Sequence, residues 1–138
     1  MAQPAFFDSN ILIYAFTQAG NKTETARRIL SQGGVVNVQS LNETVNTLRR
    51  KFNVEWPRIG QIIDAIVKQC PKPLPVAWET HRAALRICER YGYSVYDGLI
   101  IAAAREAGCT TLYSEDLQHG QIIEDLRIEN PFLAAQAP

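Results

Sequence analysis

The chain has 138 residues, of which 46% are hydrophobic and 20% are charged. This composition is typical of a globular domain and excludes a disordered chain. The formal net charge is zero, which argues against a generally basic nucleic-acid-binding protein. We find no internal repeat, low-complexity tract or linker, and therefore expect one domain over residues 1–138.

Nothing in the sequence points to a membrane or to export. Apolar stretches such as residues 11–16 and 99–104 are too short to span a bilayer. The N-terminus lacks the basic and apolar segments of a signal peptide. The three cysteines are widely spaced and odd in number, so we expect reduced core thiols rather than disulfides or a zinc site. These features favour a cytoplasmic protein with no membrane contact.

Predicted strands alternate with predicted helices along the chain. Short apolar or β-branched runs predict strands at residues 5–7, 35–38, 110–113 and 126–128. Helical periodicity predicts helices at residues 9–17, 23–32, 40–52, 57–69, 79–91 and 94–107. Segment 70–76 contributes at most an edge strand, because its prolines lack the N–H donor. This alternation predicts a three-layer α/β/α fold around a mostly parallel central sheet.

Four acidic residues stand out by their positions. Asp8 ends the first predicted strand, Glu43 lies one helical turn past the second, and Asp116 follows the third. Ligands of an open parallel sheet bind outside the carboxyl ends of its strands, so we expect these three acids at one edge. Asp97 opens a strongly apolar helix, and the sequence places it only at that helix start.

Each acid taken alone is more simply explained as a cap. Residues 40–43 have the Ser-x-x-Glu spacing of a capping box, and residues 94–97 resemble one with Asp. Asp8 or Ser9 could cap the first helix, and Asp116 could cap a turn. Such a cap contributes about 1 kcal/mol.

The four acids considered together favour a metal site instead. The nearest basic residue to Asp8 in the sequence is Lys22, and those nearest to Asp97 are Arg90 and Arg105. Clustered carboxylates repel one another unless a cation joins them. Oxygen ligands without His or Cys suit Mg²⁺ or Mn²⁺. A site of this kind can promote the hydrolysis of a phosphodiester.

Four motifs resemble, in this order, those of a known family: Phe-Asp-Ser-Asn-Ile-Leu at 7–12, Leu-Asn-Glu at 41–43, Tyr-Asp-Gly-Leu-Ile-Ile-Ala-Ala-Ala at 96–104 and Tyr-Ser-Glu-Asp at 113–116. Together they resemble a PIN domain, specifically a VapC-like toxin ribonuclease of a bacterial toxin–antitoxin system, over nearly the whole chain. The resemblance implies an endoribonuclease that depends on Mg²⁺, with Mn²⁺ as a substitute.

The same resemblance implies the site residues and the partners. The acidic cluster that would bind metal and cleave RNA comprises Asp8, Glu43, Asp97 and Asp116. Ser9, Asn10 and Ser114 match the polar positions that support those acids. The implied partners are an RNA substrate, a cognate antitoxin and a second copy of the chain in a homodimer.

Two basic clusters could contact RNA. The first ends the helix that carries Glu43 and comprises Arg49, Arg50 and Lys51. The second is a stripe at helical spacing, formed by Arg82, Arg86 and Arg90. Phosphate binding and simple solvation are equally favoured for the first cluster, whereas a solvated helix face is favoured for the stripe.

Three further features have simpler expectations. Glu115 is interpreted as a solvated surface acid, and His119 as part of a surface turn. The apolar run at residues 11–16 exceeds what one helix face needs, so we expect part of it to receive an antitoxin peptide.

Two alternative functions stay open. One is a catalytically silent PIN-like module that binds metal or protein. The other is a phosphate-monoester hydrolase of another α/β family, although Asn10 stands where an Asp-x-Asp motif needs its second Asp. A receiver-type phosphotransfer domain needs a lysine after a late strand, and the last lysine here is Lys72.

Overall fold

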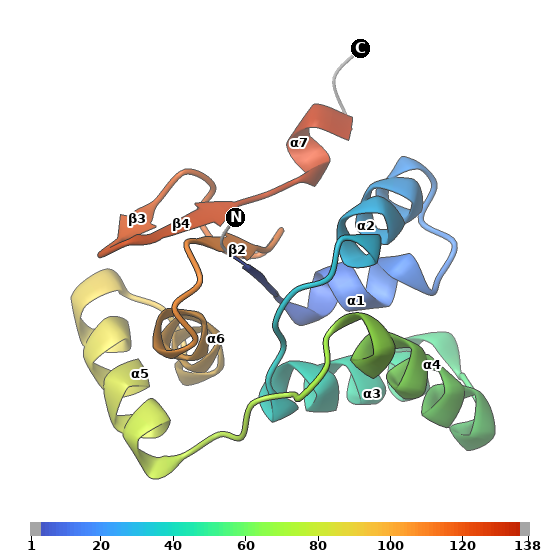
Figure 1. Cartoon of the computed structure of the whole chain (residues 1–138), viewed down its shortest axis with the longest axis horizontal. Coiled ribbons are helices and arrows are strands. Elements are labelled where there is room, and N and C mark those ends of the chain that lie inside the picture. Colours follow the sequence, from blue (N-terminus) through green and yellow to red (C-terminus); the bar gives the residue numbers. More distant parts are fainter. Residues whose placement is uncertain (1–3, 136–138) are drawn as a thin grey trace.

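A computed structural model describes residues 4–135. Within them, four strands form one sheet in the order β1-β2-β4-β3 (Figure 1). β1 (Ala5–Phe7), β2 (Thr111–Tyr113) and β4 (Leu126–Glu129) pair in parallel, and β3 (Ile122–Ile123) runs antiparallel to β4. The prediction of an α/β fold with a mostly parallel sheet is confirmed.

The six predicted helices are all present, with ends that differ from the prediction by at most two residues. They are α1 (Ser9–Ala15), α2 (Asn21–Ser31), α3 (Val38–Phe52), α4 (Trp56–Gln69), α5 (Trp78–Tyr91) and α6 (Val95–Glu106). A further short helix, α7 (Phe132–Ala135), and strand β3 were not predicted. No helix within residues 4–135 is both long and apolar enough to cross a bilayer.

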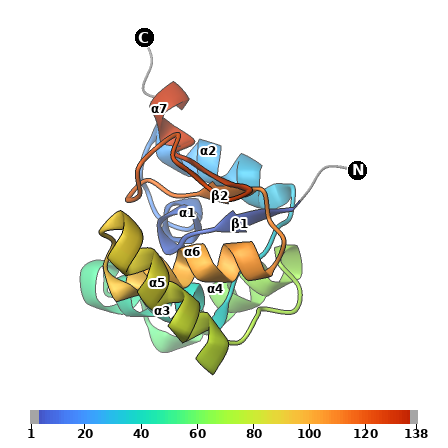
Figure 2. The same ribbon diagram turned by 90° about the vertical axis from the view of Figure 1, so that its left-hand side faces the viewer.

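The sheet separates two hydrophobic cores, because successive side chains of a strand point to opposite faces. Phe6 packs with α5 and α6 on one face, whereas Phe7 packs with α1 to α4 on the other. α5 and α6 pack side by side, and in Figure 2 they lie below β1 and β2, whereas α2 lies above these strands. Cys70 and Cys109 are buried free thiols, and burial raises the pKa of each to about 11.

The predicted strand at residues 35–38 is wrong in its extent. Only Val35 bridges to β1: its N–H donates to the Ala5 carbonyl at 2.8 Å, and its carbonyl accepts from the Phe7 N–H at 3.0 Å. Two residues later Asn37 caps α3, because its buried side chain accepts from the Ser40 N–H at 2.8 Å. The chain therefore enters a helix where a strand was expected.

The segment at 70–76 behaves as an edge, as predicted. Asn37 forms a single bridge with Leu74, and no longer strand is present there in the described part of the chain. The expected capping box over residues 40–43 is wrong, since the box at this helix joins Asn37 to Ser40 and leaves Glu43 in the helix interior.

Gly98 sets the close approach of α5 to α6. A Cβ atom at this position would lie 2.6 Å from Cys88 Sγ and 2.9 Å from the Ala84 carbonyl oxygen. The carbonyl belongs to the α5 backbone, so α5 would have to move outward to accommodate a methyl group. Glycine usually weakens a helix by about 1 kcal/mol relative to alanine, but here it allows the two helices to pack.

We expect Gly98→Ala to lower the free energy of unfolding by about 1–2 kcal/mol, because overpacking outweighs the gain in helix propensity. Gly60→Ala on α4 is the matched control, since a Cβ atom there meets nothing within 4 Å. It should stabilise the protein by about 0.5–1 kcal/mol. Urea denaturation measures both variants, and equal gains would contradict the packing role of Gly98.

Candidate active site

The four acids come from four elements that meet at one end of the molecule. Asp8 follows β1 directly and caps α1, while Asp116 follows β2. Because β1 and β2 pair in parallel, with Phe7 opposite Tyr113, both acids leave the sheet at the same edge. Glu43 lies on α3, and Asp97 lies in the first turn of α6.

Burial and the charges of the other acids raise the pKa values of three of these carboxylates. Asp8 is only 4% exposed, and its pKa is raised to about 7, chiefly by burial and then by the charges of Glu43 and Asp116. Burial also raises the pKa of Glu43, with added repulsion from Asp97 and Asp116. The pKa of Asp97 is raised by burial and by Asp116. The charge of Asp116 thus acts on all three of the other acids.

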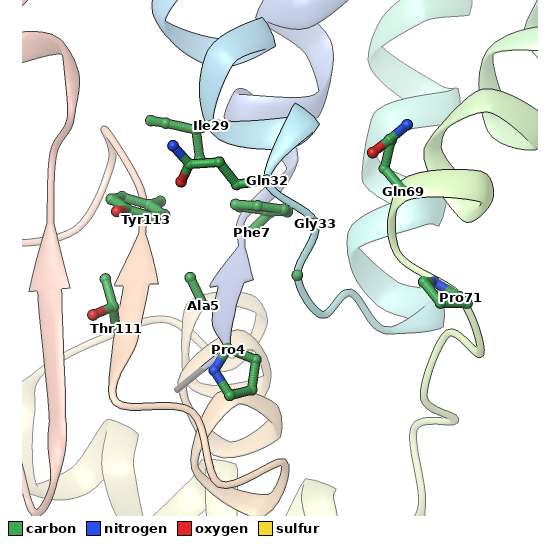
Figure 3. Close-up of a pocket in the computed structure, with 11 residues that line it drawn as sticks. Pro4, Ala5, Phe7, Ile29, Gln32, Gly33, Gln69, Pro71, Thr111 and Tyr113 are labelled. Atoms are coloured by element: carbon green, nitrogen blue, oxygen red, sulfur yellow. The ribbon is translucent and has the colours of Figure 1, made fainter. Parts of the chain in front are cut away.

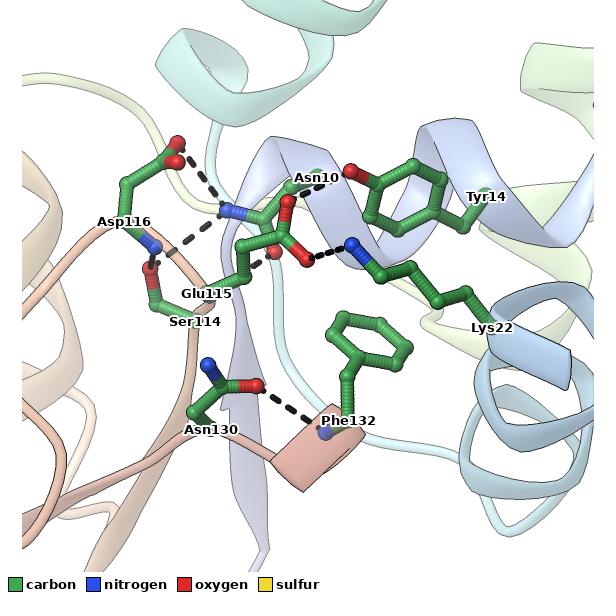
Figure 4. A network of polar contacts seen from close by, with 8 residues as sticks. All are labelled: Asn10, Tyr14, Lys22, Ser114, Glu115, Asp116, Asn130 and Phe132. Atoms are coloured by element: carbon green, nitrogen blue, oxygen red, sulfur yellow. Dashed lines mark hydrogen bonds and ion pairs between the residues drawn. The ribbon is translucent and has the colours of Figure 1, made fainter. Parts of the chain in front are cut away.

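Two polar side chains join Asp8 to Asp116. The Ser114 hydroxyl donates to Asp8 Oδ2 at 2.7 Å and accepts from the Asp116 N–H at 3.1 Å. Asn10 Nδ2 donates to Asp116 Oδ2 at 3.2 Å, and the Glu115 N–H donates to Asn10 Oδ1 at 3.2 Å (Figure 4). Ser114 and Asn10 are both buried, so these bonds fix the loop after β2 against the start of α1.

Capping explains part of this arrangement but not the acidic groups as a set. Asp8 does cap α1, since its Oδ1 accepts from the Ser9 N–H at 2.8 Å. At α6 the cap is Ser94, whose hydroxyl accepts from the Asp97 N–H at 3.3 Å, so the Asp97 carboxylate is not needed for it. Glu43 accepts from Gln39 Nε2 at 3.2 Å within α3.

The donor set fits a divalent cation in its chemistry. Neither ion pair found within the described residues involves any of the four acids, so their coupled charges lack a cationic partner. No group of three or more Asp, Glu, His or Cys side chains in residues 4–133 already stands close enough to hold an ion. The side chains that could hold one are the carboxylates of Asp8, Glu43, Asp97 and Asp116, and their oxygens suit Mg²⁺ or Mn²⁺.

Glu115 is not the solvated surface acid that the sequence favoured. Its carboxylate accepts from the Tyr14 hydroxyl and forms an ion pair with Lys22 at 2.9 Å (Figure 4). Lys22 Nζ also lies 5.1 Å from the centroid of the Tyr14 ring and 5.8 Å from that of Phe132. We call Glu115, Tyr14 and Lys22 the Glu115 network. It turns the Glu115 carboxylate away from Asp116 and holds the loop after β2 against α1 and α2.

Removing the cation of the Glu115 network tests its contribution. We expect Lys22→Met to lower the free energy of unfolding by roughly 1 kcal/mol, through loss of a half-buried ion pair and a cation–π contact. Arg127→Met breaks the exposed Arg127–Glu129 pair, 3.5 Å long, and should cost less than about 0.5 kcal/mol. Thermal denaturation compares the two, and equal losses would argue against a structural role for the network.

The three residues of the first basic cluster have different surroundings in the structure. Arg49 donates to the Val54 carbonyl at 3.1 Å and stacks over Trp56, with 4.9 Å from its guanidinium to the ring centroid. Arg49 therefore ties the end of α3 to the start of α4. Arg50 is exposed, and Lys51 lines a pocket of about 260 Å³ that Asp116 also borders.

His119 is exposed, and its Nδ1 accepts from the Asn130 N–H at 3.0 Å, as a residue of a surface turn.

The apolar run at 11–16 is buried only in part. Ile11 and Leu12 are fully buried and Ile13 is 8% exposed, so these three residues belong to the core. Phe16 is half-buried, and it lines a pocket of about 380 Å³ together with Ala15. That part of this run receives an antitoxin peptide stays a prediction.

A separate pocket of about 500 Å³ lies beside β1 and β2, near the ends of α2 and α4 (Figure 3). Phe7, Tyr113, Gln32 and Gln69 contribute to its lining, and none of the four acids borders it. The acidic cluster and this pocket are distinct features of the fold.

Sequence comparison places the chain in a known family. The PIN domain family matches residues 5–123, and the chain belongs to this family. The match spans all four acids, and it confirms the resemblance to a PIN domain. No curated protein is similar enough in sequence to match the chain.

Several solved structures share the fold. VapC20 of Mycobacterium tuberculosis, a sarcin–ricin loop cleaving toxin, has a TM-score of 0.65 and 18% identity, over 81% of this chain and 89% of that one. A toxin–antitoxin complex from Klebsiella pneumoniae gives a TM-score of 0.68 and 15% identity, over 92% and 97%. VapBC2 of Rickettsia felis, bound to a DNA fragment from its promoter, gives 0.65 and 16%, over 91% and 97%.

Proposed function

We propose that the chain is a divalent-metal-dependent endoribonuclease and the toxin of a bacterial type II toxin–antitoxin pair. The observation that carries this proposal is the set of four coupled carboxylates, without cationic partners, at the carboxyl edge of the sheet in a PIN domain. The fold it shares with toxins of toxin–antitoxin systems supports the biological setting. Such a toxin acts on RNA in the cytoplasm.

The chain's own residues would prepare the site for hydrolysis of an RNA phosphodiester by water. Asp8, Glu43, Asp97 and Asp116 would hold Mg²⁺, for which Mn²⁺ could substitute. When bound, the cation supplies the positive charge that activates water and stabilises the leaving oxygen. Ser114 and Asn10 orient Asp8 and Asp116 through the hydrogen bonds described above, and Ser9 lowers the pKa of Glu43 through a hydrogen bond. Ser114 and Ser9 thereby favour the ionised carboxylates of Asp8 and Glu43, which a metal requires.

The proposed partners follow from the same function. Lys51, which lines the pocket beside Asp116, and the exposed Arg50 are the members of the first basic cluster best placed to contact RNA. A cognate antitoxin would control the toxin, and the toxin would form a homodimer. The toxin–antitoxin complexes among the similar folds support the antitoxin, and the homodimer is proposed from the resemblance of the sequence to the family.

Cleavage of a labelled structured RNA tests the proposal. The purified protein is incubated with Mg²⁺, with Mn²⁺ and with chelator, beside Asp97→Asn and the control Asp64→Asn on the exposed face of α4. We expect cleavage that requires metal, is lost in Asp97→Asn and is kept in Asp64→Asn. Asparagine at 97 leaves the Ser94 cap intact, because that bond uses the backbone N–H.

This experiment, together with a phosphate-monoester assay and calorimetry, distinguishes the proposed function from the two alternatives. If all three proteins behave alike, the activity is a contaminant and the nuclease proposal fails. Hydrolysis of a phosphate monoester with no cleavage of RNA would indicate the phosphatase alternative. Calorimetric binding of Mn²⁺ without any hydrolysis would indicate a catalytically silent module.

A further inference from the structure

An arginine-lined cleft lies between α5, α6 and the β3–β4 hairpin. Arg86 and Arg90 come from α5 and Arg105 from α6, and the cleft between them has a volume of about 260 Å³. Its lining also includes Ala83, Ile87, Tyr91, Ile123 and Glu124. We call this feature the arginine cleft.

Its charge is not neutralised by the protein. Glu124 is the one carboxylate among the lining residues, against three guanidinium groups. Neither ion pair found within the described residues involves Arg86, Arg90 or Arg105. Arginine stays protonated at any physiological pH, so the cleft keeps an excess positive charge. An anionic ligand would relieve the repulsion between these groups.

The cleft is bordered by α6, the helix that carries Asp97, and by its neighbour α5. α5 and α6 are antiparallel: Thr80 at the start of α5 donates to Glu106 at the end of α6 at 2.8 Å. At the other end, Cys88 Sγ donates to the carbonyl of Ser94 at 3.1 Å, and Ser94 caps the turn that carries Asp97. Arg90 therefore lies in the turn of α5 nearest the acids, and Arg86 lies about 6 Å farther along the helix axis.

We propose that the arginine cleft binds the phosphodiester backbone of the RNA strand on one side of the cleaved bond. This inference rests on the proposed ribonuclease function. Guanidinium groups match phosphate oxygens with paired N–H donors. A strand leaving the acidic cluster along α5 meets Arg90 first and Arg86 one turn later. An acidic peptide offers the same charge but gives no reason for this alignment with Asp97.

Two members of the arginine stripe on α5 therefore have a proposed role in place of the solvated helix face that the sequence favoured. Arg86 and Arg90 border a cleft with Arg105, a residue that the helical spacing did not connect to them. Arg82 does not line the cleft, and for it the solvated face remains the prediction.

RNA binding by Arg86→Ala/Arg90→Ala tests the proposal. The double variant is made in an Asp97→Asn background, so that the labelled single-stranded RNA is not consumed, and fluorescence anisotropy is measured over a range of salt concentrations. Arg58→Ala on α4, away from α5 in Figure 1, removes an equivalent exposed charge as the control. We expect the affinity to fall by about tenfold, and the slope of log K against log[salt] to fall by about 0.7 for each lost phosphate contact.

Cleavage by the same double variant with Asp97 intact gives a second readout. Because the cleft holds substrate away from the reacting bond, we expect a raised KM with little change in kcat. An unchanged affinity and salt slope would overturn the arginine cleft while leaving metal-dependent cleavage, and so the proposed function, intact. If the unaltered protein neither binds nor cleaves RNA, the proposed function fails and the cleft assignment fails with it.

A polyglutamate peptide serves as the competing ligand. If it binds and loses affinity in Arg86→Ala/Arg90→Ala, while RNA binding is unaffected, the cleft receives an acidic protein segment and the RNA assignment is wrong. Loss of RNA binding in the double variant but not in Arg58→Ala supports the assignment.

Discussion

In metal-free buffer at pH 8, Asp8→Asn is expected to melt at a higher temperature than the parent protein. The folded protein holds Asp8 with a pKa of about 7, against an ordinary value of 3.8. Ionising this buried carboxyl costs the folded state on the order of 4 kcal/mol. Asparagine removes that cost but loses an acceptor for the Ser114 hydroxyl, so we expect a net gain of about 1–3 kcal/mol, or roughly five to ten degrees.

The stabilisation expected for Asp8→Asn should grow as the pH rises. The raised pKa means that the folded state binds the proton more tightly than the unfolded state, so the parent protein loses stability as the pH rises from about 4 to about 7. Asp8→Asn should lack that part of the slope, and within this range the two proteins should be closest in stability at about pH 4, where the carboxyl is protonated in the folded state and about half protonated in the unfolded state. The raised pKa values of Glu43 and Asp97 act in the same direction and remain in the variant.

Thermal denaturation from pH 4 to pH 8 measures both effects. Asp64→Asn makes the same chemical change at an exposed position and should move the melting temperature little at either pH. A melting temperature of Asp8→Asn at or below that of the parent at pH 8 would show that the burial of Asp8 and its acidic neighbours do not make the ionised carboxylate costly in the folded protein.

Saturating Mn²⁺ is expected to raise the melting temperature of the parent protein by on the order of ten degrees. A ligand that binds only the folded state, present at about 100 times its dissociation constant, raises the free energy of unfolding by about 2.7 kcal/mol. For a protein of this length, that increase corresponds to a rise of about ten degrees in melting temperature. Mg²⁺ should act in the same direction, and chelator should reverse the effect. Asp97→Asn should respond much less, since it removes one of the proposed ligands.

The metal response should also weaken in mild acid. Binding requires ionised carboxylates, and Asp8 is half protonated at about pH 7 in the folded protein. Mn²⁺ at a fixed concentration should therefore stabilise the protein more at pH 8 than at pH 6. No shift at either pH would remove the metal site from the proposal.

The sequence predicted the helices and the edge of the sheet better than it predicted the connections. Periodic apolar residues define a helix locally, so all six longer helices could be found. Asp8 and Asp116 could be assigned to one edge because Asp8 directly follows β1, Asp116 lies three residues after the end of β2, and these strands pair in parallel. The strand at 35–38 was overextended because β-branched residues favour strands, whereas the buried cap at Asn37 starts α3 within that segment.

Contacts between distant segments could not be predicted. Lys22 and Glu115 are separated by 93 positions, and nothing local indicates that Tyr14 lies beside them. Helix propensity alone disfavours Gly98, and its packing role depends on Ala84 and Cys88, which approach it from α5. The arginine cleft has the same origin, because helical spacing relates Arg86 to Arg90 but does not bring Arg105 to them.

Pairing of β1 with β2 has a consequence for the synthesis of the protein. Ser114, whose hydroxyl binds Asp8, is made 106 positions after it, and Asp116 is made later still. A chain on the ribosome that lacks β2 therefore carries an unfinished acidic cluster, and under the proposed function it cannot cut the RNA around it. Under that function, activity can begin only after β2 has emerged and joined the sheet, so the fold delays cleavage until both parts of the cluster have been made.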